Sequence, residues 1–470
     1  MQSPKEQGFE WEAFFFIPTS LRIDAQTYGE AAIQSDLQSY VRFAVPRIPF
    51  GELVEAPLSA LGAALAGSDD ALTMRELRLF ACHVRAAGVR EFRDIRRGLV
   101  EPGSAPSLAL ARSARMIGDA TCLSERLTGC LQAAAARGED VAWISALVAE
   151  DVSKVLETLL GSLSRELGKA GAPRELRQAA TEAAVEEPRR RRAGRPEGLG
   201  GGKLDKGEVE HLEFRRHVLK RITSSVLWLQ PELRQPGELV KQLLYALAAG
   251  VAMAFALIAA FANGLDVRDD RIWIWSSVAV LAYAAKDRIK ASLQNVFRRF
   301  VSQRFPNRRW LIRDAERGVA LGKVDEQSGF VRPEALPEPS LALRRITRGH
   351  PIEYAAHPES ILRHHRMIRL RPDRIAEADP RFTAITEIFR LDLRNWLAHT
   401  DNPNREILYA DPEAGRIRAA MAPRVYNINV VYRLRRAGAE DVPWRRVRVV
   451  VGRKGIHRID PIPDSTPQPS

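Results

Sequence analysis

The sequence predicts an α+β protein in three parts: a mostly helical N-terminal cytosolic domain, a transmembrane helical hairpin with flanking amphipathic helices, and an antiparallel β-rich C-terminal cytosolic domain. Three observations lead to this prediction. Apolar residues recur with the helical period from about residue 57 to 185, and with period two over 426–435. Between these regions, residues 243–261 read LLYALAAGVAMAFALIAAF, which is nineteen positions without a charge in a chain that is 27% charged.

The composition limits the size of the protein and the kind of partner it meets. Its 470 residues suffice for two to four domains, and 45% apolar residues are ordinary for a chain with buried cores. The net charge of +13 favours an acidic partner surface, either lipid headgroups or nucleic acid. Cys82, Cys122 and Cys130 lack metal-ligand spacing and are typical of thiols in a reducing compartment. The first twenty residues do not resemble a signal peptide, so we expect the N-terminal domain in the cytosol.

The predicted N-terminal domain covers residues 1–185. It opens with two strand-like segments, EWEAFFFIP and YVRFAVPRIPF, and continues with amphipathic helices. The Arg/Gly-rich segment 186–205 breaks the helical pattern and is predicted to be a flexible linker, whose four consecutive arginines are solvated or meet phosphates. The residues that mark the apolar helix faces are Leu77, Phe80 and Val84, and in a later helix Val152, Val155, Leu159 and Leu163.

The membrane region is predicted over 206–310, with spans at about 243–262 and 272–285. The first run has twenty uncharged residues with apolar side chains on every face, about 30 Å of helix, which matches the hydrocarbon thickness of a bilayer. The alternative is the central helix of a large soluble domain. The second run has fourteen uncharged residues, about 21 Å, with tryptophans near its start and basic residues at its end that can reach the headgroups.

The distribution of Lys and Arg favours two spans over one. Residues 220–241 carry four such residues and 286–309 carry eight, whereas the connecting loop carries two. With two spans both basic flanks stay in the cytosol, so both termini are expected there. With one span a strongly basic segment would have to be translocated. No ionisable residue lies within either run, which argues against a transport path through one hairpin but leaves a pore built from several copies open.

Two sets of residues in this region are predicted to make contacts. Small residues four apart let helix backbones approach closely, within the hairpin or between protomers, although an Ala-rich helix also produces this spacing. A basic amphipathic helix after the second span is expected to lie against anionic headgroups, or to pack against a heptad-like seam at Leu212, Leu219 and Val226. The packing candidates are Ala246, Gly250 and Ala254, and a second row with the same spacing is Ala248, Ala252, Ala256 and Ala260. The headgroup candidates are Lys286, Arg288, Lys290, Arg298, Arg299 and Arg304.

The predicted C-terminal α+β domain covers 311–462 and is followed by a tail, 463–470, that is expected to be disordered. The segment 318–331 reads as two strands around a turn at Gln327–Gly329, and 381–401 reads as a helix. Strands over 426–436 and 445–451 are expected to form an antiparallel sheet with one buried face and one basic face.

Candidate chemistry in this domain is sparse. His350, His357 and His364 are spaced by seven, whereas short-range metal ligands usually lie three to five residues apart, so a metal site is not favoured and we expect no cofactor. The pair His399 and Asp401 lacks a nucleophile with recognisable context and is expected to cap a helix, so no catalytic residue is assigned. Nucleic acid is not favoured as a partner, because the tyrosines of 426–436 alternate with its arginines instead of sharing their face.

Three segments carry a resemblance to a known family. AYAAKDRIKASL (282–293), FFFIPTSLRI (14–23) and QSYVRFAVP (38–46) resemble a family of uncharacterised bacterial membrane proteins with a Lys-Asp-Arg-Ile-Lys element directly after a transmembrane hairpin. The resemblance implies an inner-membrane location and no known activity. No functional residue is carried over from it.

The prediction from the sequence is therefore a two-span inner-membrane protein that acts as a non-enzymatic scaffold or regulatory module. Its expected partners are membrane lipid and a protein of unknown identity, and a homo-oligomer is left open. Two other hypotheses stay open: a metal-dependent enzyme in the C-terminal domain, and a subunit of a multimeric pore.

Overall fold

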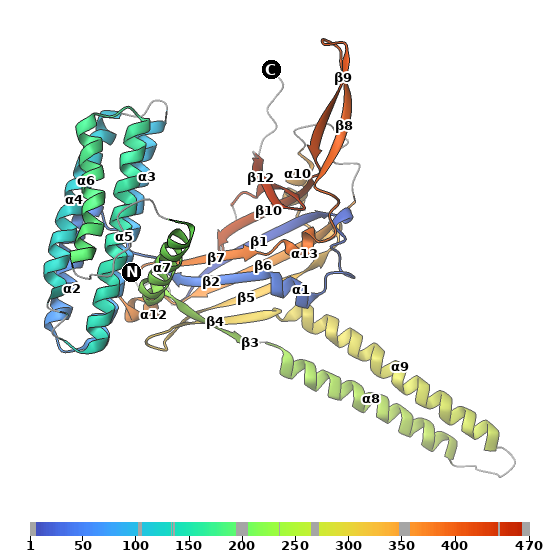
Figure 1. Ribbon diagram of the computed structural model, residues 1–470. Coiled ribbons are helices and arrows are strands. Elements are labelled where there is room, and N and C mark those ends of the chain that lie inside the picture. Colours follow the sequence, from blue (N-terminus) through green and yellow to red (C-terminus); the bar gives the residue numbers. More distant parts are fainter. Residues whose placement is uncertain are drawn as a thin grey trace.

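The computed structural model describes residues 6–101, 106–132, 134, 137–193, 205–234, 236–264, 272–346, 358–439 and 442–462. It confirms the predicted mixture of helices with a large antiparallel sheet. Figure 1 shows a helical bundle on one side of this sheet, a helical hairpin that projects from the sheet's far edge, and a thin β-ribbon that projects from its other end. Short 3-10 helices occur at Thr19–Leu21, Phe50–Val54, Ser225–Leu227 and Pro333–Ala335.

The helical bundle forms because its helices bury the apolar faces that the sequence predicts. Leu77, Phe80 and Val84 are buried, and Leu159 and Leu163 face them from a later helix in the same core. The helix that carries the first three begins at an N-cap, where the Asp69 side chain accepts a hydrogen bond from the Leu72 amide. The bundle helices are α2 (Ala56–Ala66), α3 (Asp70–Val100), α4 (Pro106–Gln132), α5 (Glu139–Lys169) and α6 (Arg174–Ala193).

The predicted linker begins later than expected, because α6 continues through Pro188 to Ala193. Side-chain contacts with α5 hold this last part of the helix: Ser153 donates to Glu187 at 2.6 Å, and Arg191 pairs with Glu157. The arginines at 189–192 are therefore helical, and the remainder of the predicted linker up to residue 204 lies outside the described residues. After it, a capping box of Asp205 and Glu208 starts α7 (Lys206–Ser224), which packs against α3 and α5.

The large sheet has eight strands in the order β12-β11-β10-β1-β6-β5-β4-β3, and the pairs within it are antiparallel. Its residues come from both ends of the chain. The strands are β1 (Gln7–Pro18), β3 (Leu229–Arg234), β4 (Arg308–Asp314), β5 (Ala320–Val331), β6 (Glu359–Leu370), β10 (Tyr426–Arg436), β11 (Arg445–Gly452) and β12 (Gly455–Ile462).

The position of β1 corrects the predicted domain boundary at residue 185. This strand lies in the middle of the sheet, between β10 and β6, and the other seven strands come from residues 229–462. The reason is its composition: Phe14 and Phe16 are buried on one face of the sheet, and Ala13, Phe15 and Ile17 on the other. A strand that is apolar on both faces is stable only in a sheet that is covered on both faces. The first strand therefore belongs with the C-terminal sheet, and only the helices form the bundle.

Both faces of the large sheet are covered by smaller elements. One face packs against α1 (Glu30–Asp36), a two-stranded sheet of β2 (Leu37–Phe43) and β7 (Ile385–Leu391), and α13 (Arg394–Leu397), where Trp396 is completely buried. On the other face α10 (Glu338–Arg345) packs over β10 and β11. The expected single buried face is thus wrong for β10, since Ile428 on one side and Val431 on the other are both buried. The helix α12 (Pro372–Ala378) adds to a further core at β4 and β5.

Two local predictions differ from the structure. The predicted turn at Gln327–Gly329 lies inside the unbroken strand β5, where all three residues pair with β6. The predicted helix over 381–401 is instead β7 followed by the single turn of α13. Its apolar positions fit a helix, but Thr386 and Ile388 are β-branched and pair with β2, so tertiary pairing decides the conformation.

Candidate functional site

Among the described residues, many of the exposed large apolar side chains lie on one helical hairpin. It consists of α8 (Glu238–Gly264) and α9 (Ile272–Arg304), which pack against each other and extend away from the sheet (Figure 1). Within the described residues one helix segment, Glu238–Ile258, is long and apolar enough to cross a membrane, and only 11% of its apolar window is buried. The uncharged run of α9 ends at Ala285, so the second span stays a prediction. Exposed side chains of α8 include Leu243, Leu247, Val251, Phe255, Leu257, Ile258 and Phe261.

The contact between the two helices uses the second of the two predicted rows of small residues and not the row of the packing candidates. The buried row contains Ala248 and Ala252, which are 0% and 2% exposed. The predicted packing residues Ala246, Gly250 and Ala254 are exposed, and a Cβ added at Gly250 would meet nothing within 4 Å. The two rows lie on different faces of α8. The row of Ala246, Gly250 and Ala254 therefore does not hold the hairpin together, and it remains open for contact with lipid or with a second copy.

The basic residues predicted to contact headgroups lie along α9. Arg288, Lys290 and Arg304 are exposed, whereas the Lys286 ammonium lies 3.8 Å from the centre of the Tyr283 ring. The side chains of Arg298 and Arg299 lie outside the described residues. The alternative prediction is that α9 packs against the seam at Leu212 and Leu219. The described part of the chain does not have this packing, because α7, which carries the seam, packs against the bundle and buries Leu219 there (2% exposed).

The histidines do not come together as a metal site in the described part of the chain. His350 and His357 lie outside the described residues, and no group of three or more His, Cys, Asp or Glu side chains among the described ones could hold a metal ion. His364 is completely buried between the rings of Trp11 and Phe389, and its Nδ1 lies 2.7 Å from the Ser328 hydroxyl. Burial lowers its pKa to about 3, and the charges of Arg366 and His365 add to this.

A buried polar cluster next to His364 joins the two sheets. The Arg366 guanidinium is 2% exposed; it contacts Glu387 of β7 at 2.6 Å and Glu326 of β5 at 4.0 Å. Glu326 also accepts a hydrogen bond from the Trp310 indole at 3.0 Å, and Glu387 accepts one from Ser39 at 2.6 Å. These contacts compensate the buried charges and fix the small sheet over the large one.

The basic face predicted for β10 is neutralised by β1. Glu12 accepts from Arg363 and Arg433 at 2.8 and 3.0 Å, and Glu10 pairs with Arg435 at 2.7 Å and with His365 at 3.0 Å. Burial opposes the ionisation of Glu10, but the hydrogen bonds from His365 and Arg435 outweigh it and lower its pKa. The arginines that the sequence places on an open basic surface are thus engaged in ion pairs within the sheet.

The last candidate pair separates in the structure. His399 is exposed, and the Asp401 carboxylate contacts Arg424 at 2.8 Å. A role for the two as base and orienter therefore has no geometric support. The thiol of Cys82 is buried, and burial raises its pKa to about 12, so it is not a reactive nucleophile at neutral pH.

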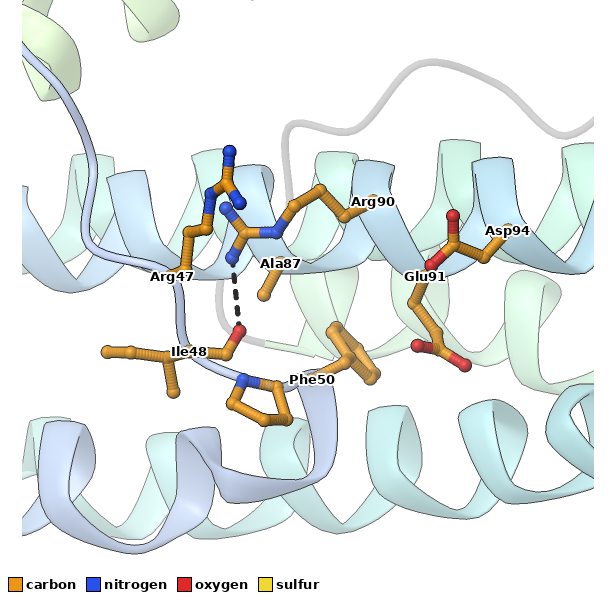
Figure 2. A pocket seen from close by; sticks show the side chains of 8 residues that line it. Arg47, Ile48, Phe50, Ala87, Arg90, Glu91 and Asp94 are labelled. Atoms are coloured by element: carbon orange, nitrogen blue, oxygen red, sulfur yellow. Dashed lines mark hydrogen bonds between the residues drawn. The ribbon is translucent and has the colours of Figure 1, made fainter.

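A shallow cleft of about 240 Å³ lies between the loop before α2 and the helix α3. Figure 2 shows the Arg47 and Arg90 guanidinium groups side by side at one end, and the carboxylates of Glu91 and Asp94 at the other. Arg90 donates to the Ile48 carbonyl at 3.1 Å, and its pKa is lowered by burial and by the charge of Arg47. Sequence reasoning missed this cleft, since a loop packing on a helix forty residues later leaves no periodic signal.

An ion-pair cluster connects the bundle to the sheet. Arg381, which follows α12, donates to Glu76 of α3 at 2.6 and 2.8 Å and to Asp379 at 2.8 Å. Asp379 also contacts Arg75 of α3 at 2.9 Å. The hydrogen bonds that Arg381 donates to Glu76 and Asp379 raise its pKa. Burial opposes the ionisation of Asp379, but its bonds with Arg381 lower its pKa to about 2. The bundle is therefore held to the sheet by the buried charges of Arg75, Glu76 and Asp379, joined by a half-buried Arg381.

Comparison of the chain with protein families, curated proteins and solved structures finds no match. The resemblance based on residues 282–293 therefore stays a prediction.

Proposed function

We propose that this protein is a membrane-anchored, non-enzymatic scaffold or regulatory module, in which the α8–α9 hairpin enters the lipid and the bundle and sheet remain in the cytosol. The observation that carries the proposal is the exposure of the apolar residues of α8. Leu243 is 71% exposed, Ile258 67% and Phe261 73%. A soluble protein rarely leaves a continuous apolar surface of this length in water, whereas lipid covers it without a cost.

The size of the apolar surface supports insertion. The seven large α8 side chains named above are each at least 40% exposed. Transfer of a half-exposed Leu or Phe out of water contributes about 1 kcal/mol, so these seven together favour insertion by roughly 7 kcal/mol. This is comparable to the free energy of unfolding of a whole domain, and a second surface of similar composition or a bilayer is needed to realise it.

The way the hairpin is attached supports two crossings over one. β3 leads into α8 and α9 leads into β4, and these two strands are hydrogen-bonded neighbours with Arg234 opposite Arg309. The hairpin thus leaves the sheet and returns to it at one place. If α8 enters a bilayer, α9 returns to the same side, as the excess of Lys and Arg on both flanks predicts for the cytosolic side of a bacterial inner membrane.

The depth of insertion is limited by α9. Its uncharged part, residues 272–285, is about 21 Å long, while a bilayer core is about 30 Å thick. Lys286, Arg288 and Lys290 follow directly and reach headgroups only by extending along the helix, with local thinning of the bilayer. Together with Arg298, Arg299 and Arg304 they form the proposed headgroup-contact set, which favours anionic lipid.

The test is co-flotation of the full chain with vesicles of phosphatidylglycerol and phosphatidylethanolamine. The double variant Val251→Glu/Phe255→Glu is expected to lose most of its vesicle-bound fraction, because two charges then lie within the apolar run of α8. Leu108→Glu is the matched control, since Leu108 is an exposed apolar residue (61%) on the bundle. Equal flotation of both variants with the unmodified protein would exclude the hairpin as the anchor.

The number of crossings is tested separately by labelling. Asp269→Cys places a thiol between the two proposed spans, in a background where Cys122 and Cys130 are replaced by serine. A membrane-impermeant maleimide should label it in intact spheroplasts, whereas the thiol of Ser465→Cys should react only after the cells are opened. Labelling of both positions from one side would refute the two-span topology while leaving membrane association intact.

A further inference from the structure

The β-ribbon formed by β8 (Asn404–Asp411) and β9 (Arg416–Pro423) stands clear of the rest of the molecule (Figure 1). The two strands pair only with each other and form a separate two-stranded sheet. Every residue from Asn404 to Ala410 is exposed, and so is every residue from Arg416 to Met421. We call this ribbon the arm.

The arm by itself has little to stabilise it in water. Its register puts Leu408 opposite Ala419 and Ala410 opposite Ile417 on one face, and Leu408 is 69% exposed, Ile417 75% and Met421 63%. An isolated two-stranded ribbon is marginally stable, and three or more strands are needed for independent stability. An arm of this length with apolar side chains in solvent therefore requires an added strand or a cover.

The outer edge of β8 differs from the two edges of the large sheet. At the ends of the large sheet, β12 carries Pro461 and β3 carries Pro231, and proline blocks the addition of a strand. Strand β9 carries two arginines, Arg416 and Arg418, and Arg418 pairs with Asp411 of β8 within the arm. The β8 edge has the sequence NREILYAD, without proline and with charges of both signs. Such an edge is a template for another strand.

We propose that β8 pairs in an antiparallel manner with β8 of a second copy of this chain, with the two-fold axis at Leu408. In this register Leu408 faces Leu408 of the second copy, and Ile407 faces Tyr409. Arg405 then faces Asp411 of the second copy, and the symmetry produces each of the last two pairs twice. Aromatic with β-branched side chains and opposite charges are the cross-strand pairs that stabilise antiparallel strands.

The charge pattern selects this register and this strand. A shift of the axis by one residue to Ile407 puts Glu406 opposite Leu408 and Arg405 opposite Tyr409, so both ion pairs are lost. Self-pairing of β9 about Ala419 puts Arg416 and Arg418 opposite alanines and produces no ion pair. Pairing through β8 also produces a four-stranded sheet in the order β9-β8-β8-β9, with the basic β9 strands on the outside, where they oppose the addition of further copies.

Disulfide trapping in the full chain, purified in detergent, tests the register. Cys122 and Cys130 are first replaced by serine, while Cys82 is buried and stays. Leu408→Cys puts two thiols on the axis, with Cβ atoms about 5 Å apart, and mild oxidation should yield a covalent dimer. Ala419→Cys is the matched control on the same face of the arm; in the proposed sheet its two copies are three strand spacings, about 14 Å, apart and should not cross-link.

The cross-linking results distinguish the proposed β8 pairing from other modes of dimerisation. A dimer with Leu408→Cys and none with Ala419→Cys supports the proposal. No dimer with either variant, equal dimer with both, or dimer only with Ala419→Cys overturns it, because each excludes the β8 register. Dimerisation through the α8–α9 hairpin alone would leave Leu408→Cys unlinked, so this test does not depend on the proposed membrane anchor.

The contribution of the ion pairs to the dimer is tested by charge reversal. Sedimentation experiments compare the dimer affinity of variants that keep the three natural cysteines. Arg405→Glu places a carboxylate opposite Asp411 at both ends of the paired strands and should weaken the dimer by roughly 5- to 30-fold, whereas Arg405→Lys should change it by less than about 3-fold. Substitution of Asp411 is avoided, since its carboxylate also pairs with Arg418 of the same arm and accepts from the Glu413 and Ala414 amides in the turn. An unchanged dimer with Arg405→Glu would refute the proposed pairing.

Discussion

The stability of the sheet should depend on pH through the buried histidine at its centre. His364 has no exposed surface, its Nδ1 is bonded to Ser328, and the positive charge of Arg366 acts on it. Protonation would place a second positive charge in this apolar site, so its pKa falls from the ordinary 6.5 to about 3. Because the folded pKa is lower than the unfolded one, the unfolded state takes up a proton first as the pH falls. Folding is therefore weakened below pH 6.5 and not above it.

The expected magnitude follows from the size of this shift. Each pH unit between 6.5 and the folded pKa costs about 1.4 kcal/mol, so acidification from pH 7.5 to 5.0 should lower the free energy of unfolding by about 2 kcal/mol through His364 alone. His83 in the bundle, with a pKa lowered to about 4 mainly by burial, contributes a similar loss. The substitution His364→Gln removes the proton site of the sheet and leaves that of the bundle in place.

The measurement is urea unfolding of the full chain at pH 7.5 and 5.0 in one detergent, with the difference between the two pH values compared among variants. His364→Gln should retain about 2 kcal/mol more of its pH 7.5 stability at pH 5.0 than the unmodified protein retains. His217→Gln, at an exposed position of α7, should behave like the unmodified protein. If His364→Gln loses as much stability on acidification as the unmodified protein, the histidine is not held neutral by burial and the reasoning is wrong.

Two further predictions concern the junctions between parts of the molecule. Arg381→Met should lower the free energy of unfolding, measured with urea, by about 2 kcal/mol, because it leaves the buried Glu76 without its partner. The control Arg394→Met, at an exposed position, should change the free energy of unfolding by less than about 0.5 kcal/mol. Ala252→Leu should cost about 1–3 kcal/mol and reduce amide-exchange protection in α8, because Ala252 is buried against α9, whereas Gly250→Leu should leave protection within the hairpin unchanged. Loss of protection with Gly250→Leu but not Ala252→Leu would contradict this assignment.

Much of the local structure could be predicted from periodicity. The alternation over 426–436 correctly predicts β10, and the apolar run FFFI correctly predicts a strand at residues 14–17. The helices of the bundle bury the faces marked by Leu77 and Leu163. These patterns are readable because each one depends only on neighbours in the sequence.

The partners of these elements could not be predicted in the same way. Nothing near Glu10 or Glu12 indicates that arginines more than 350 residues away neutralise them, so the C-terminal strands considered alone predict a basic face. The residues Gln327–Gly329 have the composition of a turn, yet Ser328 is held in a strand by its contact with His364. The arm over 404–423 was missed altogether, because its weakly alternating segments are short and it has no core to impose a pattern.

The central place of β1 has a consequence for how the protein is made. Residues 7–18 are the first part of the sheet to leave the ribosome, but their two neighbours are residues 359–370 and 426–436. The helices of the bundle and the apolar hairpin are synthesised before either neighbour exists, so β1 is still unpaired when both have left the ribosome. A strand with three consecutive phenylalanines then stays without its sheet neighbours for most of translation, and we expect a chaperone or the nascent bundle to shield it.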